Sequence, residues 1–160
     1  GDIVGLDLGL THKGVIVDAA ITVPVGQISE DTKKLVAATE VALTAGIAQA
    51  IPGNHIGDIS SAIQKEIESA GFKVVKELGG HGVGDLVHEE PFIPNFGKPR
   101  EGELLFEGMV LALEPISAAG KASVVLAPDG YTYRTKDGSR SAHFEHTILI
   151  EKGGARIITA

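Results

Sequence analysis

The sequence contains no cysteine. Without thiols the chain can form no disulfide bond and no thiolate metal site, so any metal ion must be held by carboxylates, imidazoles, backbone carbonyls or water. No apolar run reaches the roughly 18 residues that a membrane span requires, and no basic and then apolar leader opens the chain. We therefore expect a cytoplasmic protein with no membrane partner.

Clusters of basic residues are also absent. The chain has 14 lysines and arginines against 21 acidic residues, which gives a formal net charge of −7. Binding to a phosphate backbone depends on lysine and arginine neutralising several phosphates, so we expect no nucleic-acid partner. With 160 residues, of which 43% are hydrophobic, the chain can bury a core, and we predict a single domain over 1–160.

The first 23 residues are predicted to form a β-hairpin with one buried face. Apolar side chains occupy every second position of the first strand, with Asp7 on the other face: Val4, Leu6, Leu8 and Leu10. If Leu10 pairs with Val15 around a four-residue loop, Asp7 lies directly opposite Asp18. Directly opposed like charges repel unless a cation lies between them, which predicts a metal site. The alternative is a pair of solvated aspartates at frayed strand ends, but each aspartate interrupts an apolar run.

Two helices and four further strands are expected downstream. Ser29 is placed to cap a helix from Glu30 to about Ala50, and Asp58 to cap one from Ile59 to Ala70 that Gly71 ends in a left-handed conformation. The stretch 79–108 is rich in glycine and proline and is predicted to be a loop. Strands are predicted at Met109 to Glu114, Ser123 to Ala127, Tyr131 to Thr135 and Ala142 to Glu151.

Two glutamates repeat the pattern of the aspartates. Glu114 ends the apolar strand MVLALEP, and Glu145 interrupts HFEHTILI. Either one alone could be a partly exposed edge residue. Together with both aspartates and with His81, whose flanking glycines leave room for a metal ion, they form a set suited to hard or borderline divalent ions. The alternative for His81 is a histidine in a turn.

The other histidines are weaker candidates. His88 precedes an acidic pair, Glu89 and Glu90, and could hydrogen-bond a substrate carbonyl or simply lie on a charged surface. The remaining four are assigned no catalytic role: His12, His55, His143 and His146.

Four segments resemble, in order and spacing, the type I methionine aminopeptidases: GLDLGLTHKGVIVDAAIT, GGHGVGDLVHEEP, EGMVLALEP and SAHFEHTILI. The resemblance covers essentially the whole chain. It implies the α/β pita-bread (creatinase/aminopeptidase) fold, a curved antiparallel sheet with helices on its outer face. It also implies two divalent ions (Mn, Fe, Co or Zn), with Asp18 and Glu145 bridging them, held by Asp7, Asp18, His81, Glu114 and Glu145.

The resemblance implies a reaction as well, the metal-assisted hydrolysis that removes N-terminal methionine from peptides and nascent chains. Glu114 would then accept a proton from water, and His88 would contact the scissile peptide. Val87 and Tyr131 stand where larger or different aromatic residues are expected around the methionine pocket, so they are predicted to bind substrate.

Two other functions remain open at this stage. Prolidase and aminopeptidase P share the aspartate spacing and a similar glycine loop, but usually carry an acidic pair after arginine where this chain has FEHT. An inactive pita-bread binding module is the second alternative, although such modules commonly lose ligands and all five ligand types are present here.

The start of the chain departs from the family pattern. Family members have a segment before the strand of Asp7, which supplies a further substrate-contacting histidine and part of the methionine pocket, whereas this sequence opens at Gly1. We therefore expect an N-terminally truncated domain whose first strand keeps an open apolar face. Such a face favours association with another polypeptide or aggregation.

Overall fold

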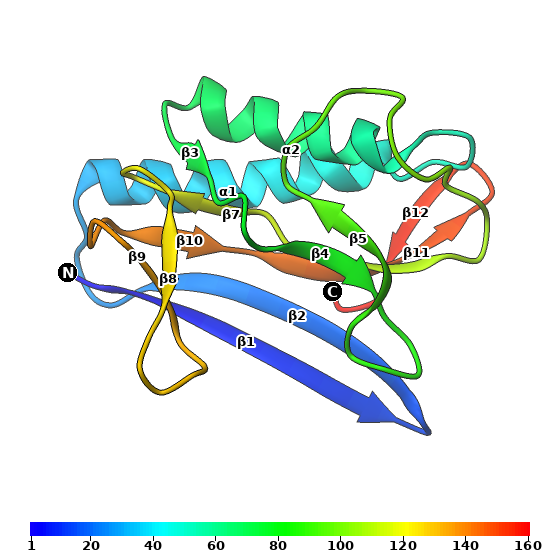
Figure 1. Ribbon diagram of the computed structural model, residues 1–160, viewed down its shortest axis with the longest axis horizontal. Helices are drawn as coiled ribbons and strands as arrows, with labels where there is room; N and C mark the ends of the chain where they lie inside the picture. The colour runs from blue at the N-terminus through cyan, green and yellow to red at the C-terminus, as the bar shows by residue number, and fades with distance from the viewer.

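The computed structural model describes residues 1–160, and its largest sheet lies beneath two helices, α1 (Glu30–Gln49) and α2 (Ile56–Ser69) (Figure 1). The strands of this antiparallel sheet follow one another in the order β1 (Ile3–His12), β2 (Val15–Pro24), β11 (Glu145–Glu151), β6 (Val110–Leu113), β4 (Gly79–Gly82) and β5 (Glu89–Pro94), with β12 (Gly154–Ile157) also paired to β11. Because β11 lies between β2 and β6, the end of the chain joins the two halves of the sheet.

Two smaller sheets flank the large one. One has the order β10 (Ser141–His143), β7 (Ile116–Ala118) and β3 (Lys73–Val74). The other is a hairpin of β8 (Val124–Leu126) and β9 (Tyr133–Thr135), which projects in front of the large sheet (Figure 1). Neither helix is long and apolar enough to cross a membrane.

The core fills the space between the helices and the large sheet. In α2, the side chains of Ile59, Ile63 and Ile67 recur at every fourth position and are fully buried. They share one apolar cluster with Leu111 of β6 and Ile148 of β11. Side chains alternate between the two faces of a strand, so the residues next to these leave the core and point to the opposite face. The candidate site lies on that opposite face.

The β1–β2 hairpin has a different register from the predicted one. Leu10 pairs with Val17, and the turn consists of Lys13 and Gly14 alone, at φ angles of 51° and 86°. Two successive positive φ angles are typical of the type I′ turn, whose twist matches the strands it joins. The direct opposition of Asp7 and Asp18 is therefore wrong. Since the register moves by two residues, an even number, both aspartates stay on one face.

The predicted burial of the first strand is also wrong. Four apolar side chains on one face of β1 are 41%, 52%, 70% and 57% exposed: Val4, Leu6, Leu8 and Leu10. The helices run along the other side of the molecule, and β1 forms the edge of the sheet farthest from them (Figure 1). This apolar surface, which we call the open β1 face, is consistent with the expectation of an uncovered first strand.

Helix ends follow the sequence closely, with one exception. The Ser29 side chain accepts a hydrogen bond from the Thr32 amide and caps α1, and Gly71 adopts a φ of 88° after α2. The predicted cap of α2 at Asp58 is wrong, because the helix begins three residues earlier and His55 is its N-cap. The Asp58 carboxylate instead accepts a hydrogen bond from the His55 amide, 2.8 Å away, which completes a capping box.

The segment predicted as a loop between 79 and 108 contains two strands of the large sheet, β4 and β5. Glycine is needed in β4 because the backbones of its neighbours approach closely. A Cβ atom at Gly80 would overlap the carbonyl oxygen of Ala112, and one at Gly82 would overlap that of Glu90. His81 is therefore a buried strand residue, and the alternative of a turn histidine is wrong.

Candidate metal centre

Register places three of the predicted carboxylate ligands in one row across the sheet. Asp7 of β1 lies opposite Ala20 of β2, and Ala20 lies opposite Glu145 of β11. Glu114 directly follows β6, where continuation of the β6–β11 register puts it next to Glu145. Acidic side chains and one small side chain therefore line this row, on the face opposite the core.

A neighbouring row holds the other two predicted ligands. His81 of β4 lies opposite Ala112, which lies opposite Thr147. The Thr147 hydroxyl accepts a hydrogen bond from the Asp18 amide and donates one to the Asp18 carbonyl, both 2.8 Å long. Small or short side chains separate the ligands in this row as well, which leaves space above the sheet.

The ligand atoms lie close enough to share metal ions. Ligand atoms of Asp18, His81 and Glu145 all lie within 4.8 Å of one another. His81 Nε2 is 3.9 Å from Glu114 Oε1 and 4.0 Å from Glu145 Oε1. These separations are too long for hydrogen bonds. They leave room for an ion at the roughly 2.0–2.2 Å that imidazole and carboxylate ligands prefer.

The orientation of His81 is fixed by its other ring nitrogen. Its Nδ1 atom lies 2.9 Å from the Gly82 carbonyl oxygen. A carbonyl oxygen can only accept, so Nδ1 donates this hydrogen bond, and Nε2 is directed toward the carboxylates. A backbone partner of this kind is the usual support for a metal-binding histidine. The His81 ring also meets the His88 ring edge to face, with centroids 4.4 Å apart.

Electrostatics favour a cation in this cluster. Burial, together with the nearby charges of Asp18, Glu114 and Asp7, raises the pKa of the Glu145 carboxyl to about 9. Glu145 is only 2% exposed and Asp18 only 7%. Buried carboxylates without a counter-charge are costly, and a divalent ion would supply that charge. The donor set of oxygens and one imidazole nitrogen fits hard or borderline ions.

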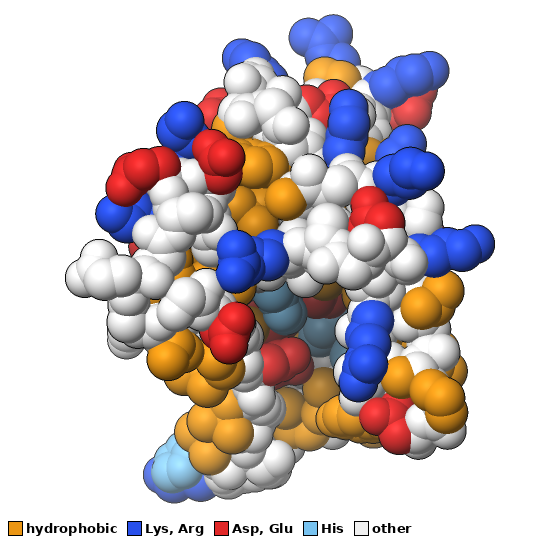
Figure 2. Space-filling model, turned by 90° about the vertical axis from the view of Figure 1, so that its left-hand side faces the viewer, with side chains coloured by type: hydrophobic (Ala, Val, Ile, Leu, Met, Phe, Trp, Pro, Cys, Tyr) orange, Lys and Arg blue, Asp and Glu red, His pale blue; other side chains and the backbone are white.

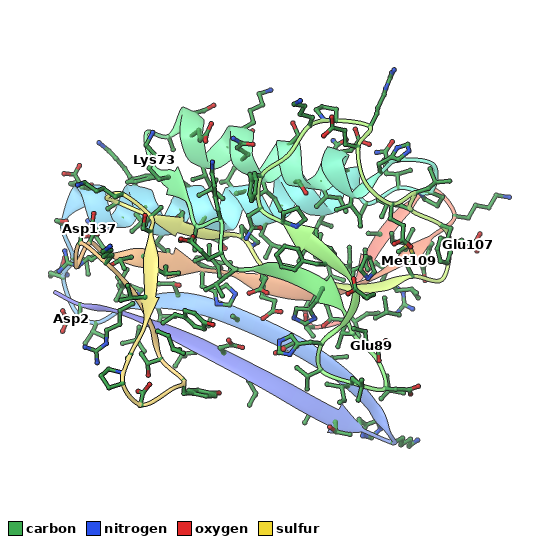
Figure 3. The ribbon with its side chains drawn as sticks, viewed as in Figure 1. Asp2, Lys73, Glu89, Glu107, Met109 and Asp137 are labelled. Carbon is green, nitrogen blue, oxygen red and sulfur yellow. The ribbon has the colours of Figure 1, made fainter.

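A cavity of about 920 Å³ opens above this cluster. It is lined by Asp7, Glu77, Leu78, Gly79, His81, Leu86, His88, Glu89, Glu90, Phe92, Glu114, Ile116, Tyr131, Tyr133 and His143, none of which is lysine or arginine. Figure 2 shows a hollow with histidine and acidic side chains at its bottom. Glu89, at the start of β5, lies toward the β1–β2 side of the molecule (Figure 3).

The structure brings most of the predicted site residues together. Three of the predicted ligands line the cavity with the predicted substrate residues His88 and Tyr131. The other two, the buried carboxylates of Asp18 and Glu145, complete the cluster. Val87 is not among the lining residues, whereas its neighbour Leu86 is.

Sequence reasoning missed several lining residues, of which His143 is the most informative. It was assigned no role, yet its Nε2 lies 3.3 Å from Glu114 Oε2. The available signal was its spacing of two residues from Glu145, which puts both side chains on one face of an extended chain.

Comparison with known proteins gives a consistent result. The model of metallopeptidase family M24 matches residues 1–152. A methionine aminopeptidase 1 of Bacillus subtilis is 47% identical over 159 residues, which cover 99% of this chain and 64% of that protein. The chain thus spans a little under two thirds of the length of this relative.

Solved structures show the same relationship. A methionine aminopeptidase from Thermotoga maritima superposes with a TM-score of 0.97 at 48% identity, covering 99% of this chain and 64% of that one. A prolidase from Pyrococcus furiosus superposes with a TM-score of 0.78 at 26% identity, covering 100% of this chain and 42% of that one. The similarity is therefore greater to the methionine aminopeptidase than to the prolidase.

Proposed function

The chain belongs to metallopeptidase family M24. On that premise we propose that it hydrolyses, at this cavity, the first peptide bond of peptides that begin with methionine. The fold is the predicted pita-bread fold, shared with methionine aminopeptidases and prolidases. The observation that carries the proposal is the convergence of four carboxylates and one imidazole, from five strands or strand ends, on one cluster beneath a cavity whose lining has no lysine or arginine. The 47–48% identity to methionine aminopeptidases supports the choice of substrate.

Two divalent ions (Mn, Fe, Co or Zn) are proposed as the cofactor. Asp18 and Glu145, the most deeply buried carboxylates of the cluster, would bridge them, and the other three ligands would complete the site: Asp7, His81 and Glu114. When bound, such ions activate water for attack and polarise the peptide carbonyl. Oxygen and nitrogen donors do not by themselves select one of the four metals.

Glu114 is the proposed proton carrier. It lines the cavity and is partly exposed, so water and a peptide nitrogen can both reach its carboxylate. It would accept a proton from the attacking water and pass it to the leaving amine. His88 lines the same cavity against His81, where a ring nitrogen can donate to the carbonyl oxygen of the scissile bond as negative charge develops on it.

The walls of the cavity suit a peptide N-terminus. Apolar and aromatic side chains at the rim can contact substrate side chains: Leu86, Phe92, Tyr131 and Tyr133. Acidic residues and the absence of lysine and arginine from the lining favour the positively charged N-terminal amine. Nascent chains that carry an initiator methionine are cytoplasmic, and we propose that compartment for the reaction.

The open β1 face is the proposed site of association. It borders a groove of about 820 Å³ that continues along Val17 and Ile21 to Ile158 near the C-terminus. About a third of the Bacillus subtilis relative has no counterpart in this chain. We propose that a polypeptide segment equivalent to that third covers the open β1 face and completes the methionine pocket.

Metal analysis combined with a peptide assay tests the proposal. The purified chain should bind up to two divalent ions and, once loaded, release methionine from a Met-Ala-Ser peptide. An Xaa-Pro dipeptide should be cleaved far more slowly. Preferential cleavage of the Xaa-Pro dipeptide would assign the site to a prolidase-like reaction, and metal binding without any cleavage would indicate a binding module.

A further inference from the structure

His143 has an unusual environment for a residue outside the proposed ligand set. Its Nε2 atom is buried, has no hydrogen-bond partner, and lies 3.3 Å from Glu114 Oε2. The ring lines the same cavity as Glu114. A distance of 3.3 Å is slightly long for a hydrogen bond to a carboxylate, so a small ring rotation would complete one.

The backbone of His143 is fixed by Thr22 of β2. The Thr22 hydroxyl donates to the His143 carbonyl at 2.7 Å and accepts from the His143 amide at 2.9 Å. Thr22 is itself only 4% exposed. The next amide, that of Phe144, donates to the carbonyl of Pro115, which directly follows Glu114. The segments that carry His143 and Glu114 are therefore tied to each other.

Glu114 is also held through its backbone. The fully buried Asn95 donates from Nδ2 to the Glu114 carbonyl oxygen at 2.9 Å. With the backbone fixed, the remaining freedom is rotation about the side-chain bonds of Glu114, which sets the direction of its carboxylate. Its two oxygens face different partners, since Oε1 is 3.9 Å from His81 Nε2 and Oε2 is 3.3 Å from His143 Nε2.

We propose that His143 is a positioning residue for Glu114, donating a hydrogen bond from Nε2 to Oε2 so that Oε1 stays turned toward the metal site. The inference rests on the proposed role of Glu114 in hydrolysis. A carboxylate that accepts a proton and binds an ion must present a defined oxygen to each, and a buried donor on one side removes the alternative rotamers. Thr22 holds that donor in place.

The test compares two substitutions at position 143. His143→Gln can place an amide donor near the position of Nε2, whereas His143→Leu keeps similar bulk without a donor. We expect His143→Leu to lower kcat about ten- to hundredfold with little change in KM, as for loss of a hydrogen bond to a charged group. His143→Gln should restore most of the rate. If His143→Leu does not fold, His143→Phe replaces it as the variant without a donor.

A second readout does not depend on hydrolysis. Titration of each metal-free protein with Co²⁺ alone, followed by visible absorption, reports the geometry of the ligands. His143→Leu should alter the spectrum and weaken binding, and His143→Gln should resemble the wild type. The difference between the two variants in Co²⁺ binding should persist even if the wild type cleaves no peptide. That result would reject the proposed hydrolysis but would retain the role of His143 in orienting the Glu114 carboxylate.

The matched control is His146, three residues along the chain. Its Nδ1 lies 3.0 Å from Thr159 Oγ1, and it does not line the cavity. His146→Leu should leave both kcat and the Co²⁺ spectrum unchanged. Equal impairment of the Leu and Gln variants at position 143, or wild-type behaviour of His143→Leu in both readouts, would overturn the proposal.

Discussion

Asp7 and Asp18 lie diagonally across the β1–β2 hairpin, with Asp7 opposite Ala20 and Asp18 opposite Gly9. Direct opposition would bring their Cβ atoms to about 5 Å, whereas a diagonal pair lies roughly 7–8 Å apart. The two aspartates therefore enter the cluster from neighbouring rows. Such spacing suits a site for two ions better than the direct opposition expected from the sequence.

Glu114→Gln should largely abolish hydrolysis and leave the fold intact. The substitution removes a proton acceptor and a charge but almost no volume, so kcat should fall by about 10²–10⁴ while the thermal midpoint changes little. Steady-state kinetics on a Met-Ala-Ser peptide measure the effect. Glu107→Gln is a suitable control, because Glu107 is exposed and lies well away from Glu89 at the cavity (Figure 3). Unchanged turnover in Glu114→Gln would eliminate the role proposed for this residue.

Chelation should inactivate the protein reversibly and lower its thermal midpoint. Ions that bind only the folded state stabilise it by about 2.7 kcal/mol at a concentration one hundred times Kd. Dialysis against a chelator followed by calorimetry, with and without added Mn²⁺ or Co²⁺, measures this difference. His81→Ala removes the only imidazole of the ligand set and should reduce the metal-dependent part of the shift. A thermal midpoint that does not change when metal is added would contradict the proposed metal site.

The stability of the metal-free protein should fall as pH rises. Burial and the neighbouring carboxylates raise the pKa of Glu145 from 4.5 to about 9, so the folded state holds this proton more tightly than the unfolded state. The stabilisation is fully present below about pH 4.5 and is lost progressively as the pH approaches 9. Urea unfolding of the metal-free protein between those limits should show the decline, and Glu145→Gln should flatten it. A stability that rises over this range would contradict the raised pKa.

Gly80→Ala should destabilise the sheet. The added methyl group would overlap the Ala112 carbonyl oxygen of the neighbouring strand, and overpacking of this kind costs about 1–3 kcal/mol. Gly5→Ala is the matched control, because a Cβ atom there meets nothing within 4 Å. Urea denaturation of both variants should separate them clearly. Equal midpoints would mean that β4 and β6 can move apart without cost.

The open β1 face should drive association. Leu8 is 70% exposed on this face, so the wild-type sedimentation coefficient should increase with protein concentration, and Leu8→Glu should suppress the increase. Val41→Glu introduces the same charge at a 52% exposed position on α1 and should have no such effect. A wild type that stays monomeric at all concentrations, with full methionine selectivity, would show that the face needs no cover.

Local patterns predicted much of the fold. The capping residue Ser29 and the apolar periodicity of helices and strands indicated the correct elements. These signals depend only on residues that are close in the sequence. The faces of Asp7, Asp18, Glu114 and Glu145 followed from the same alternation. The register of the first hairpin did not, since Lys13-Gly14 lacks the Asn-Gly or Asp-Gly signature of a type I′ turn.

Features set by distant residues were not predictable. The glycine-rich β4 has no apolar periodicity, and its strand conformation depends on close approach of β5 and β6 from either side. The contact of His143 with Glu114 joins segments that lie far apart in the sequence, so the spacing of His143 from Glu145 indicated a shared face but not this partner. The period-2 pattern of β1 showed which side chains share a face. Whether that face is buried depends on a further layer of structure packing against it, which the pattern does not reveal.

The central position of β11 has a consequence for biosynthesis. Asp7 and Asp18 belong to the β1–β2 half of the sheet, and His81 and Glu114 to the half built around β4 and β6. Only β11, which follows the other ligand-bearing strands in sequence and carries Glu145, pairs with both halves. A nascent chain that still lacks β11 therefore cannot assemble the ligand set, and ion loading would report that the sheet has closed.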